Sequence, residues 1–562
     1  MTSNFERIWH KSYSPGVPAE IAIEQVTMAE ALSRSALMYP EMPAMIYMGK
    51  RISFREFDRL VNRCVRALKA LGVKKGDKVA MLLPNIPQVV IANFAVFRIG
   101  AVAAMNNPLY TERELANQLN DQDAEVLVTL DLLVPRIRKI RQQTKIRTII
   151  ACHINDYLPF PQKQLFPYVK KKMYRKLTAS DGALDFQSLI AQYPDSPVPD
   201  EAEWTDVGAL LYTGGTTGVT KGVMLTHANL CSNIQQLKSW MPEFQNGKER
   251  FLAIFPFFHA AGFTGMQNFG VYTGSTLILV PRPETDIIVD LIRKFKPTFI
   301  PGVPTIFVGL LNNAKFKQLD LRFIKHFIAG AAPLTMNTIQ ELKDMTGGFI
   351  GNIYGLTETS PLATATPATG KQKPDTVGIP LPGTDLKIVD VETGSKEMPL
   401  GEPGEICLKG PQVMRGYYNK PEETAAVLKD GWLHTGDIGM LDEDGFLTIM
   451  DRKKDMIIAS GYNIYPHEID EILFDHPKIL EACAVGIPDK YRGETVKAFV
   501  VTKPGEDLTR DEVIHYCKEH LAVYKVPKHI EFMEALPKSA VGKILRRELI
   551  ERELRASQQR PG

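Results

Sequence analysis

Short apolar segments alternate with segments of helical periodicity through the first 300 residues, and this alternation limits the possible folds more than any other feature. Strands that are separated by helices usually pair in parallel, because the crossing helix returns the chain to the edge at which the previous strand began. We therefore predict an α/β fold with mostly parallel sheets covered by helices. The clearest strand candidates are AEVLVTL (124–130), IRTIIAC (146–152), RFLAIFP (250–256), STLILV (275–280) and PTFIPG (297–302).

The most apolar stretch runs from Gln88 to Met105 and has to be compared with a membrane span. Arg98 and Gly100 interrupt it, so its continuous apolar part is about half of the roughly 20 residues that a span needs. We interpret KVAMLLPN as a strand, QVVIANFAVFRIG as a buried helix and AVAAMNNP as the next strand. The N-terminus lacks the apolar core of a signal peptide, so we expect a cytoplasmic protein.

The character of the chain changes after Gly378, where Gly and Pro turns separate short β segments. A chain of 562 residues exceeds the roughly 100–200 residues that one domain usually holds. We predict a large N-terminal body of mostly parallel sheets over 1–450, with a β-rich lobe at about 378–450. A hinge at 451–455 then leads to a small mobile C-terminal α+β domain over 456–562.

Charge and cysteine content exclude several classes of function. The net charge of +3 is too small to argue for nucleic acid as a partner. None of the six cysteines has metal-ligand spacing to another cysteine or to a histidine. We expect buried thiols in a reducing compartment.

The stretch YTGGTTGVTKGVMLTH (212–227) is rich in glycine and threonine but does not fit the G-x-x-x-x-G-K-[ST] loop. Because β-prone residues flank it on both sides, we expect a strand–loop–strand arrangement. Glycines allow backbone N–H groups to turn inward, and threonine hydroxyls and a lysine add donors and charge. The pattern favours a phosphate cradle; a glycine-rich hairpin without a ligand is the alternative. The residues concerned are Thr213, Gly214, Gly215, Thr216, Thr217, Gly218 and Lys221.

Three further stretches carry groups suited to nucleotide chemistry. NIYGLTETS (352–360) brings together an aromatic ring that could stack on a purine, a hydroxyl for a phosphate and a carboxylate for Mg²⁺. Asp437 lies in a T-G-D-I-G turn and could accept hydrogen bonds from ribose, although a plain Asx turn would explain it too. Lys543 follows a glycine in PKSAVGKILRREL (537–549), where a solvated surface lysine is the alternative to a moving catalytic cation.

These four stretches, in this order, resemble the adenylate-forming superfamily, which includes acyl-CoA synthetases, peptide-synthetase adenylation domains and firefly luciferase. The resemblance covers nearly the whole chain. The segment from Asp430 to Lys454, NNPLYTERELANQLND (106–121) and FERIWHKSYSPGVPAEI near the N-terminus are most similar to bacterial long-chain fatty-acid–CoA ligases. The resemblance implies that ATP activates a fatty acid to acyl-AMP, and that coenzyme A then displaces AMP.

The resemblance also implies roles in the first half-reaction. The loop from Thr213 to Lys221 would hold the β- and γ-phosphates. Glu358 would ligate Mg²⁺, and Thr357 would bond the α-phosphate. The adenine would lie between the stretch that contains Tyr354 and Gly355 and the stretch GAAPL (330–334), which contains Gly330 and Ala331.

For the second half-reaction the resemblance implies a change of surroundings. Asp437 and Arg452 would bind the ribose hydroxyls, and Lys454 would act as the hinge. Lys543 would bridge the acyl carboxylate and the α-phosphate during adenylation only. Gly461 would pass close to the pantetheine arm of coenzyme A.

Several alternatives stay open at this stage. His259 matches an acyl-site motif, but a satisfied core histidine is the other interpretation. The rival functions are a fatty acyl-AMP ligase that serves a carrier protein, a medium-chain acyl-CoA synthetase and an adenylate-binding pseudoenzyme.

Residues 155–178 mix apolar and basic side chains, and their second half predicts a basic amphipathic helix. That segment would give peripheral contact with the inner face of the cell membrane; a solvated insertion is the alternative. A homodimer is also left open.

Overall fold

The computed structural model describes residues 7–213, 220–330, 334, 336–459, 462–489, 492–539 and 542–558. The chain divides into two compact units that are both discontinuous in sequence. The first unit contains Met1–Asp385 and Lys409–Leu433, and the second contains Leu386–Leu408 and His434–Gly562. The predicted hinge at 451–455 lies within the second unit, and the domain boundary there stays a prediction.

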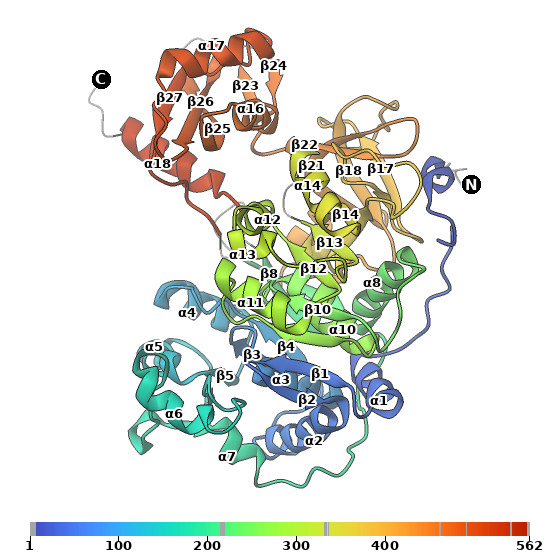
Figure 1. The fold of residues 1–562 in the computed structure, drawn as a ribbon, viewed down its shortest axis with the longest axis vertical. Helices are drawn as coiled ribbons and strands as arrows, with labels where there is room; N and C mark the ends of the chain where they lie inside the picture. The colour runs from blue at the N-terminus through green and yellow to red at the C-terminus, as the bar shows by residue number, and fades with distance from the viewer. Residues whose placement is uncertain are drawn as a thin grey trace. The chain divides into compact units, whose positions relative to one another are not determined.

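Two large sheets build the described part of the first unit (Figure 1). In the first, β1 and β10–β14 pair in parallel, and antiparallel strands β2, β15 and β16 flank them. Its order is β16 (Ile379–Pro380), β15 (Leu362–Ala365), β14 (Phe349–Gly355), β13 (His326–Ala329), β12 (Phe299–Gly302), β10 (Arg250–Ala253), β11 (Thr276–Leu279), β1 (Pro43–Tyr47) and β2 (Lys50–Ser53).

The second sheet is parallel from β8 to β7, and β9 and β19 run antiparallel at its other edge. Its order is β19 (Gly416–Tyr417), β9 (Lys221–Thr226), β8 (Val207–Thr213), β4 (Val102–Met105), β3 (Lys78–Leu82), β5 (Val126–Leu130), β6 (Thr148–Cys152) and β7 (Ala183–Asp185). All the strand candidates named above form strands, and the predicted mostly parallel α/β architecture is confirmed.

Helices connect and cover these strands. Their bounds are α1 (Met28–Met38), α2 (Phe54–Ala70), α3 (Pro87–Ile99), α4 (Glu112–Asp121), α5 (Val134–Ile140), α6 (Gln162–Val169), α7 (Phe186–Ile190), α8 (His227–Trp240), α9 (Ala260–Gly262), α10 (Phe269–Tyr272), α11 (Thr285–Phe295), α12 (Pro304–Leu311), α13 (Ala314–Lys317), α14 (Met336–Thr346) and α15 (Pro421–Val427). A π-helical segment, Phe263–Asn268, joins α9 to α10.

Helix α3 explains the apolar stretch of the sequence. Every one of its residues is buried, as expected for a mostly apolar helix inside a large core. Pro87 stands in its first turn, where the missing N–H costs nothing, and Gly100 ends it with a φ of 72°. Among the described residues, no helix is long and apolar enough to cross a membrane.

The second unit contains two smaller sheets and three helices in its described residues. One sheet contains β17 (Asp385–Val389), β18 (Gly404–Lys409), β21 (Trp432–Leu441) and β22 (Leu447–Arg452). The short strand β20 (Leu428–Lys429) pairs with Trp432 and Leu433 at the start of β21, and these residues are assigned to the first unit. The other contains β24 (Tyr462–Ile464), β23 (Ile457–Ala459), β26 (Gly493–Thr502), β25 (Ile479–Asp489) and β27 (His529–Phe532). The helices are α16 (Pro466–Phe474), α17 (Arg510–His520) and α18 (Arg546–Gln558). Apolar residues of α16 and α17 form a core with β25 and β26.

The segment 155–178 differs from its prediction. The helix, α6, spans the middle of the segment, and the basic residues after it contain only a short 3-10 turn at Lys171–Met173. Two causes are evident. Pro161 precedes the first turn of α6, where proline does not hinder a helix. Pro167 lies inside α6, where proline lacks the N–H that would bond to the preceding turn, and the helix ends two residues later at Val169.

Candidate active site

The hairpin β8–β9 carries the ends of the predicted phosphate loop. Thr213 ends β8, Lys221 begins β9, and the two residues are partners across the antiparallel pair. Gly222 lies opposite Tyr212, and an added Cβ would come within 3.0 Å of the Tyr212 ring. Glycine therefore lets the ring lie against the partner strand, and the Tyr212 hydroxyl donates to Asp121 at 2.7 Å. Five predicted loop residues lie outside the described residues: Gly214, Gly215, Thr216, Thr217 and Gly218.

The end of β14 carries the second predicted stretch. Tyr354 and Gly355 are its last two residues, and Thr357 and Glu358 lie in the 3-10 turn that follows. Gly355 is required here, because an added Cβ would lie 1.8 Å from the carbonyl oxygen of Pro361, the residue before β15. Because the backbone at Gly355 contacts that of Pro361, the turn lies against the start of β15, and this contact fixes the backbone position of Glu358.

Glu358 is held at its backbone and at its carboxylate. Its carbonyl oxygen accepts a hydrogen bond from the N–H of Met414 at 2.8 Å. Its Oε1 accepts one from the Tyr417 hydroxyl at 2.9 Å. The Lys221 Nζ lies 4.9 Å from the centroid of the same Tyr417 ring, at cation–π distance. One aromatic ring thus brings the phosphate-loop lysine and the predicted metal ligand together.

Tyr417 was not among the residues that the sequence pointed to. It lies 59 positions from Glu358 in the chain, in the two-residue strand β19 that pairs with β9. Burial, followed by the negative charge of Glu358, raises the pKa of Tyr417 far above its usual range. The phenol therefore keeps its proton and acts as a hydrogen-bond donor. The only sequence signal was an aromatic pair, Tyr417 and Tyr418, next to a glycine.

Gly330 follows β13, and its N–H donates to the Gly302 carbonyl at 3.1 Å. Ala331 lies outside the described residues. Gly330 and Tyr354 therefore lie at the carboxyl ends of the neighbouring parallel strands β13 and β14, the edge at which α/β proteins bind ligands. Thr213 occupies the corresponding end of β8 in the other sheet.

His259 precedes α9 and caps it, because its Nδ1 accepts a hydrogen bond from the Ala261 N–H at 3.3 Å. Its side chain is exposed, so the interpretation as a core histidine is wrong. Phe255 and Phe257 beside it are buried. The role of His259 at an acyl site stays a prediction.

The second unit presents the predicted ribose-binding pair on adjacent strands. Asp437 of β21 and Arg452 of β22 are partners in the ladder, and Arg452 Nε lies 3.2 Å from Asp437 Oδ1. The Asp437 side chain is nearly buried, so its charge is compensated locally by the guanidinium. A ribose hydroxyl could bind this carboxylate only by donating a hydrogen bond to it, since an ionised carboxylate is only an acceptor.

Lys543 lies in a turn where the Ser539 N–H donates to its carbonyl at 2.8 Å, and Gly542 precedes it with a φ of 78°. The side chain has exposed surface, yet many protein atoms surround it. This desolvation, followed by the charge of Arg452, lowers the pKa of Lys543 from 10.5 to about 8. The exposed surface shows that water still reaches the group.

Lys454 is exposed and lies in the turn that follows β22. The same turn is held by a hydrogen bond from the Lys453 N–H to the Gly436 carbonyl at 2.9 Å. Gly461 lies outside the described residues. The structure therefore brings Asp437, Arg452 and Lys543 into one unit, while the phosphate and metal candidates belong to the other.

Comparison with known proteins decides the family. The family model for AMP-binding enzymes matches residues 32–418, and the model for the AMP-binding enzyme C-terminal domain matches residues 468–543. The chain belongs to the AMP-binding enzymes. The two matches cover most of its length, as the resemblance in the sequence implied.

Three proteins illustrate how far the similarity of this AMP-binding enzyme extends. A long-chain-fatty-acid–CoA ligase of Bacillus subtilis is 43% identical over 98% of both chains. ATP-bound MatB from Rhodopseudomonas palustris superimposes with a TM-score of 0.82 at 29% identity, covering 94% of this chain and 99% of that one. A fatty acyl CoA synthetase of Mycobacterium tuberculosis gives a TM-score of 0.72 at 27% identity, with the same coverage.

Glu358 is the residue predicted to ligate Mg²⁺ in this AMP-binding enzyme. Among the described residues there is no cluster of three His, Cys, Asp or Glu side chains that could hold an ion by itself. Mg²⁺ is commonly held by one or two carboxylates together with substrate phosphates and water. A single carboxylate beside a phosphate-loop lysine fits that mode of binding.

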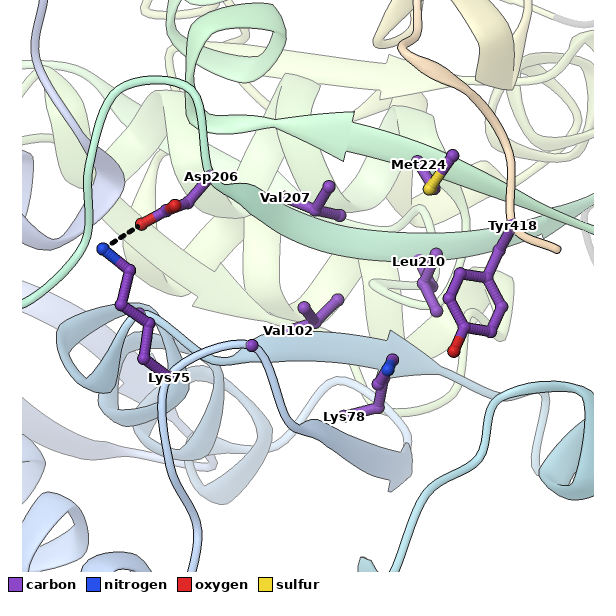
Figure 2. Close-up of a pocket in the computed structure, with 10 residues that line it drawn as sticks. Lys75, Lys78, Val102, Asp206, Val207, Leu210, Met224 and Tyr418 are labelled. Carbon is purple, nitrogen blue, oxygen red and sulfur yellow. Dashed lines mark ion pairs between the residues drawn. The ribbon is translucent and has the colours of Figure 1, made fainter.

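A separate cavity of about 300 Å³ lies at the other end of the second sheet (Figure 2). Its lining includes Lys78, Val102 and Val207, which are the first residues of β3, β4 and β8. Lys75 at its rim pairs with Asp206 at 3.0 Å, so its charge is already compensated. The cavity is therefore distinct from the end of β8 at Thr213, where nucleotide binding is predicted for this AMP-binding enzyme.

Proposed function

We propose that this protein activates a long-chain fatty acid with ATP and transfers the acyl group to coenzyme A. The products would be acyl-CoA, AMP and pyrophosphate. The observation that carries the proposal is the full-length likeness, at 43% identity, to a long-chain-fatty-acid–CoA ligase. The association of Lys221 with Glu358 through Tyr417 supports it, because adenylation needs a cation and a metal-binding carboxylate close together.

In the first half-reaction a carboxylate oxygen of the fatty acid attacks the α-phosphorus. The bond from that phosphorus to the bridging oxygen breaks, and pyrophosphate leaves. Lys221 would offset the charge of the leaving phosphates, the threonine hydroxyls of the loop would donate hydrogen bonds to them, and Thr357 would bond the α-phosphate. Lys543 would hold the two anionic reactants in line.

Magnesium belongs to this proposal as well. Glu358 would hold Mg²⁺ against the ATP phosphates, where the ion offsets the negative charge that develops on pyrophosphate. Calorimetric titration of ATP with and without Mg²⁺, on the wild-type chain and on Glu358→Gln, tests this role. Equal dependence on Mg²⁺ in both proteins would remove Glu358 from the metal site.

In the second half-reaction the coenzyme A thiol attacks the acyl carbon, and AMP leaves with the bonding electrons. Lys543 would have to vacate the site, because the pantetheine arm needs a path to the acyl carbon. Rotation about the turn at Lys454 would exchange the two arrangements.

The central test is a chain-length series. Purified enzyme is supplied with ATP, coenzyme A and fatty acids from C2 to C18, and kcat/KM is measured for each. We expect the highest kcat/KM with long-chain fatty acids; the highest kcat/KM with medium-chain acids would instead identify a medium-chain acyl-CoA synthetase. Coenzyme A consumed per AMP formed should be one; formation of AMP without consumption of coenzyme A would indicate an acyl-AMP ligase instead.

A second part of the proposal places residues 160–173 on an anionic membrane surface. Apolar side chains are unusually exposed there: Phe160 is 83% accessible, Tyr168 74% and Val169 71%. Phe166 is buried and anchors α6 to the body of the protein. Lys170–Lys172 follow directly and are exposed. Exposed aromatic and aliphatic groups next to cations match the interfacial region of an anionic bilayer.

Vesicle sedimentation tests this surface. Binding to vesicles with anionic lipid should exceed binding to neutral vesicles, and salt should weaken it. Replacing Lys170–Lys172 with glutamine should reduce binding, at roughly 1 kcal/mol per well-placed cation. Glutamine at Lys294, Lys315 and Lys317 is the matched control, and an equal loss in that control would contradict the proposal.

Light scattering in the same buffers tests the homodimer, which stays a prediction.

A further inference from the structure

Two consecutive tyrosines at the end of β19 each contact a lysine and a carboxylate. Tyr417 has Lys221 Nζ 4.9 Å from its ring centroid and donates its hydroxyl to Glu358 at 2.9 Å. Tyr418 has Lys78 Nζ 4.9 Å from its ring centroid and donates its hydroxyl to Asp123 at 3.2 Å. Each ring therefore carries an ammonium group on its face and a carboxylate at its hydroxyl.

The two tyrosines differ in where they lie. Tyr418 lines the cavity at the amino ends of β3, β4 and β8, where Figure 2 shows its ring beside Lys78. Asp123 there also pairs with Lys145, so the charge at that end is structural. Tyr417 instead joins two residues that are candidates for phosphate and metal binding. The same local chemistry is thus present once between two predicted nucleotide-site residues and once between two residues with no predicted role in that site.

The position of Tyr417 is closely determined. Its backbone pairs with Val223 of β9, and its N–H donates to Thr424 Oγ1 at 2.9 Å. Its side chain is 8% exposed. The carbonyl of Glu358 is bonded to Met414, three residues before Tyr417. The ring is therefore held on a short segment that also fixes the backbone of Glu358.

We propose that Tyr417 is a positioning residue of the adenylation half-reaction, which orients the Glu358 carboxylate through its hydroxyl and the Lys221 ammonium through its ring. The proposal rests on the function proposed above. A glutamate side chain has three rotatable bonds, and a hydrogen bond at one oxygen restricts the directions in which the carboxylate can point. Ordering before the substrate arrives lowers the cost of assembling the metal and the phosphates.

The two contacts predict different defects. The hydroxyl acts on the metal ligand, so Tyr417→Phe should weaken metal-dependent steps and leave the ring contact with Lys221 in place. The ring acts on the lysine, so Tyr417→Leu should additionally weaken the grip on the phosphates. Tyr418→Phe is the matched control, because it removes a hydroxyl in the same chemical setting at the other site.

The experiment compares wild type, Tyr417→Phe, Tyr417→Leu and Tyr418→Phe as full-length chains. Acyl-dependent ATP–pyrophosphate exchange gives kcat and the KM for ATP, and calorimetry with Mn²⁺ and ATP, without fatty acid, gives metal-dependent binding without turnover. For Tyr417→Phe we expect a fall of about tenfold in exchange and a several-fold higher half-saturating Mn²⁺ concentration. Tyr417→Leu should also raise the KM for ATP, and Tyr418→Phe should match wild type.

Equal Mn²⁺ binding and exchange in Tyr417→Phe and Tyr418→Phe would overturn the positioning role. Thioester formation from supplied acyl-AMP separates this role from a folding defect, because that step does not use the metal-bound pyrophosphate. It should be unchanged in Tyr417→Phe, and a proportional loss there would also overturn the proposal. Absence of exchange in the wild type with every fatty acid would instead refute the proposed function.

Discussion

The two units hold their candidate functional residues in different ways. In the first unit the backbone holds them: Thr213 and Lys221 are partners in a hairpin, and Glu358 is bonded to Met414 through its carbonyl. In the second unit charge surrounds them: Arg452 lies against Asp437, and both act on the pKa of Lys543. A site built by backbone pairing has its geometry set at folding, whereas a site built around a perturbed ammonium group responds to pH and to movement.

The largest expected effect tests the first unit, whose candidate residues are held by backbone contacts. Glu358→Gln removes the charge of the metal ligand but keeps an oxygen that can accept from Tyr417. Acyl-dependent ATP–pyrophosphate exchange should fall by about 10²–10³ or more, since the pyrophosphate charge loses its compensation. Glu341→Gln, which alters an exposed partner of Lys317, serves as the control. Near wild-type exchange in Glu358→Gln would refute the role.

A substitution at Lys543 in the second unit should affect the two half-reactions differently. Lys543→Ala should lower adenylation by roughly 10² and still convert supplied acyl-AMP to acyl-CoA, because the lysine acts only before the adenylate exists. Exchange and thioester formation are measured on the same preparation. A proportional loss of both would place Lys543 among the surface charges.

The predicted hinge should show the reverse pattern. Proline at Lys454 fixes φ there and restricts Lys453 before it, so the turn after β22 loses its freedom. If the fixed arrangement is the adenylating one, Lys454→Pro keeps exchange and loses acyl transfer to coenzyme A. Lys454→Ala is the control for the loss of the side chain alone. Loss of exchange together with transfer would argue against a hinge at this turn.

Changing the pH should produce a smaller and graded effect. The pKa of Lys543 is lowered to about 8 from an ordinary 10.5, so its positive charge is lost as pH rises through 8. Adenylation by the wild type should fall about tenfold between pH 7 and pH 9 beyond the change seen in the second half-reaction. Lys543→Arg should flatten this limb, because arginine stays protonated there. If the adenylation rate of Lys543→Arg still falls over the same pH range, the titrating group is not Lys543.

The smallest expected effect again concerns the first unit. Gly355→Ala would place a methyl group 1.8 Å from the Pro361 carbonyl oxygen, so the strand and the turn carrying Glu358 must shift. We expect a loss of roughly 1–3 kcal/mol in the free energy of unfolding, measured by urea denaturation. Gly265→Ala is the control, since an added Cβ there meets nothing within 4 Å. An equal loss in both variants would remove the steric argument.

The strands and the phosphate hairpin could be predicted because their signals are local. Alternating apolar segments specify β3, α3 and β4, and β-prone residues on both sides of the glycines specify β8 and β9. Tyr417 could not be predicted, because its role depends on β19 pairing with β9 about 190 residues earlier in the chain. The lowered pKa of Lys543 also depends on groups distant in sequence, Arg452 and Asp437. The helix expected in the basic half of 155–178 was wrong, because α6 contains Pro167 and ends at Val169, before Lys170–Lys172.

The discontinuous path of the chain decides how this enzyme can be divided into fragments. The second unit needs 386–408 as well as everything from His434 onward. A C-terminal fragment that starts at His434 would lack β18, the hydrogen-bonding neighbour of β21. The unpaired edge of β21 would then be open to pairing with other chains. Expression of that fragment should yield aggregates, and limited proteolysis at 409–433 should leave two pieces that stay associated.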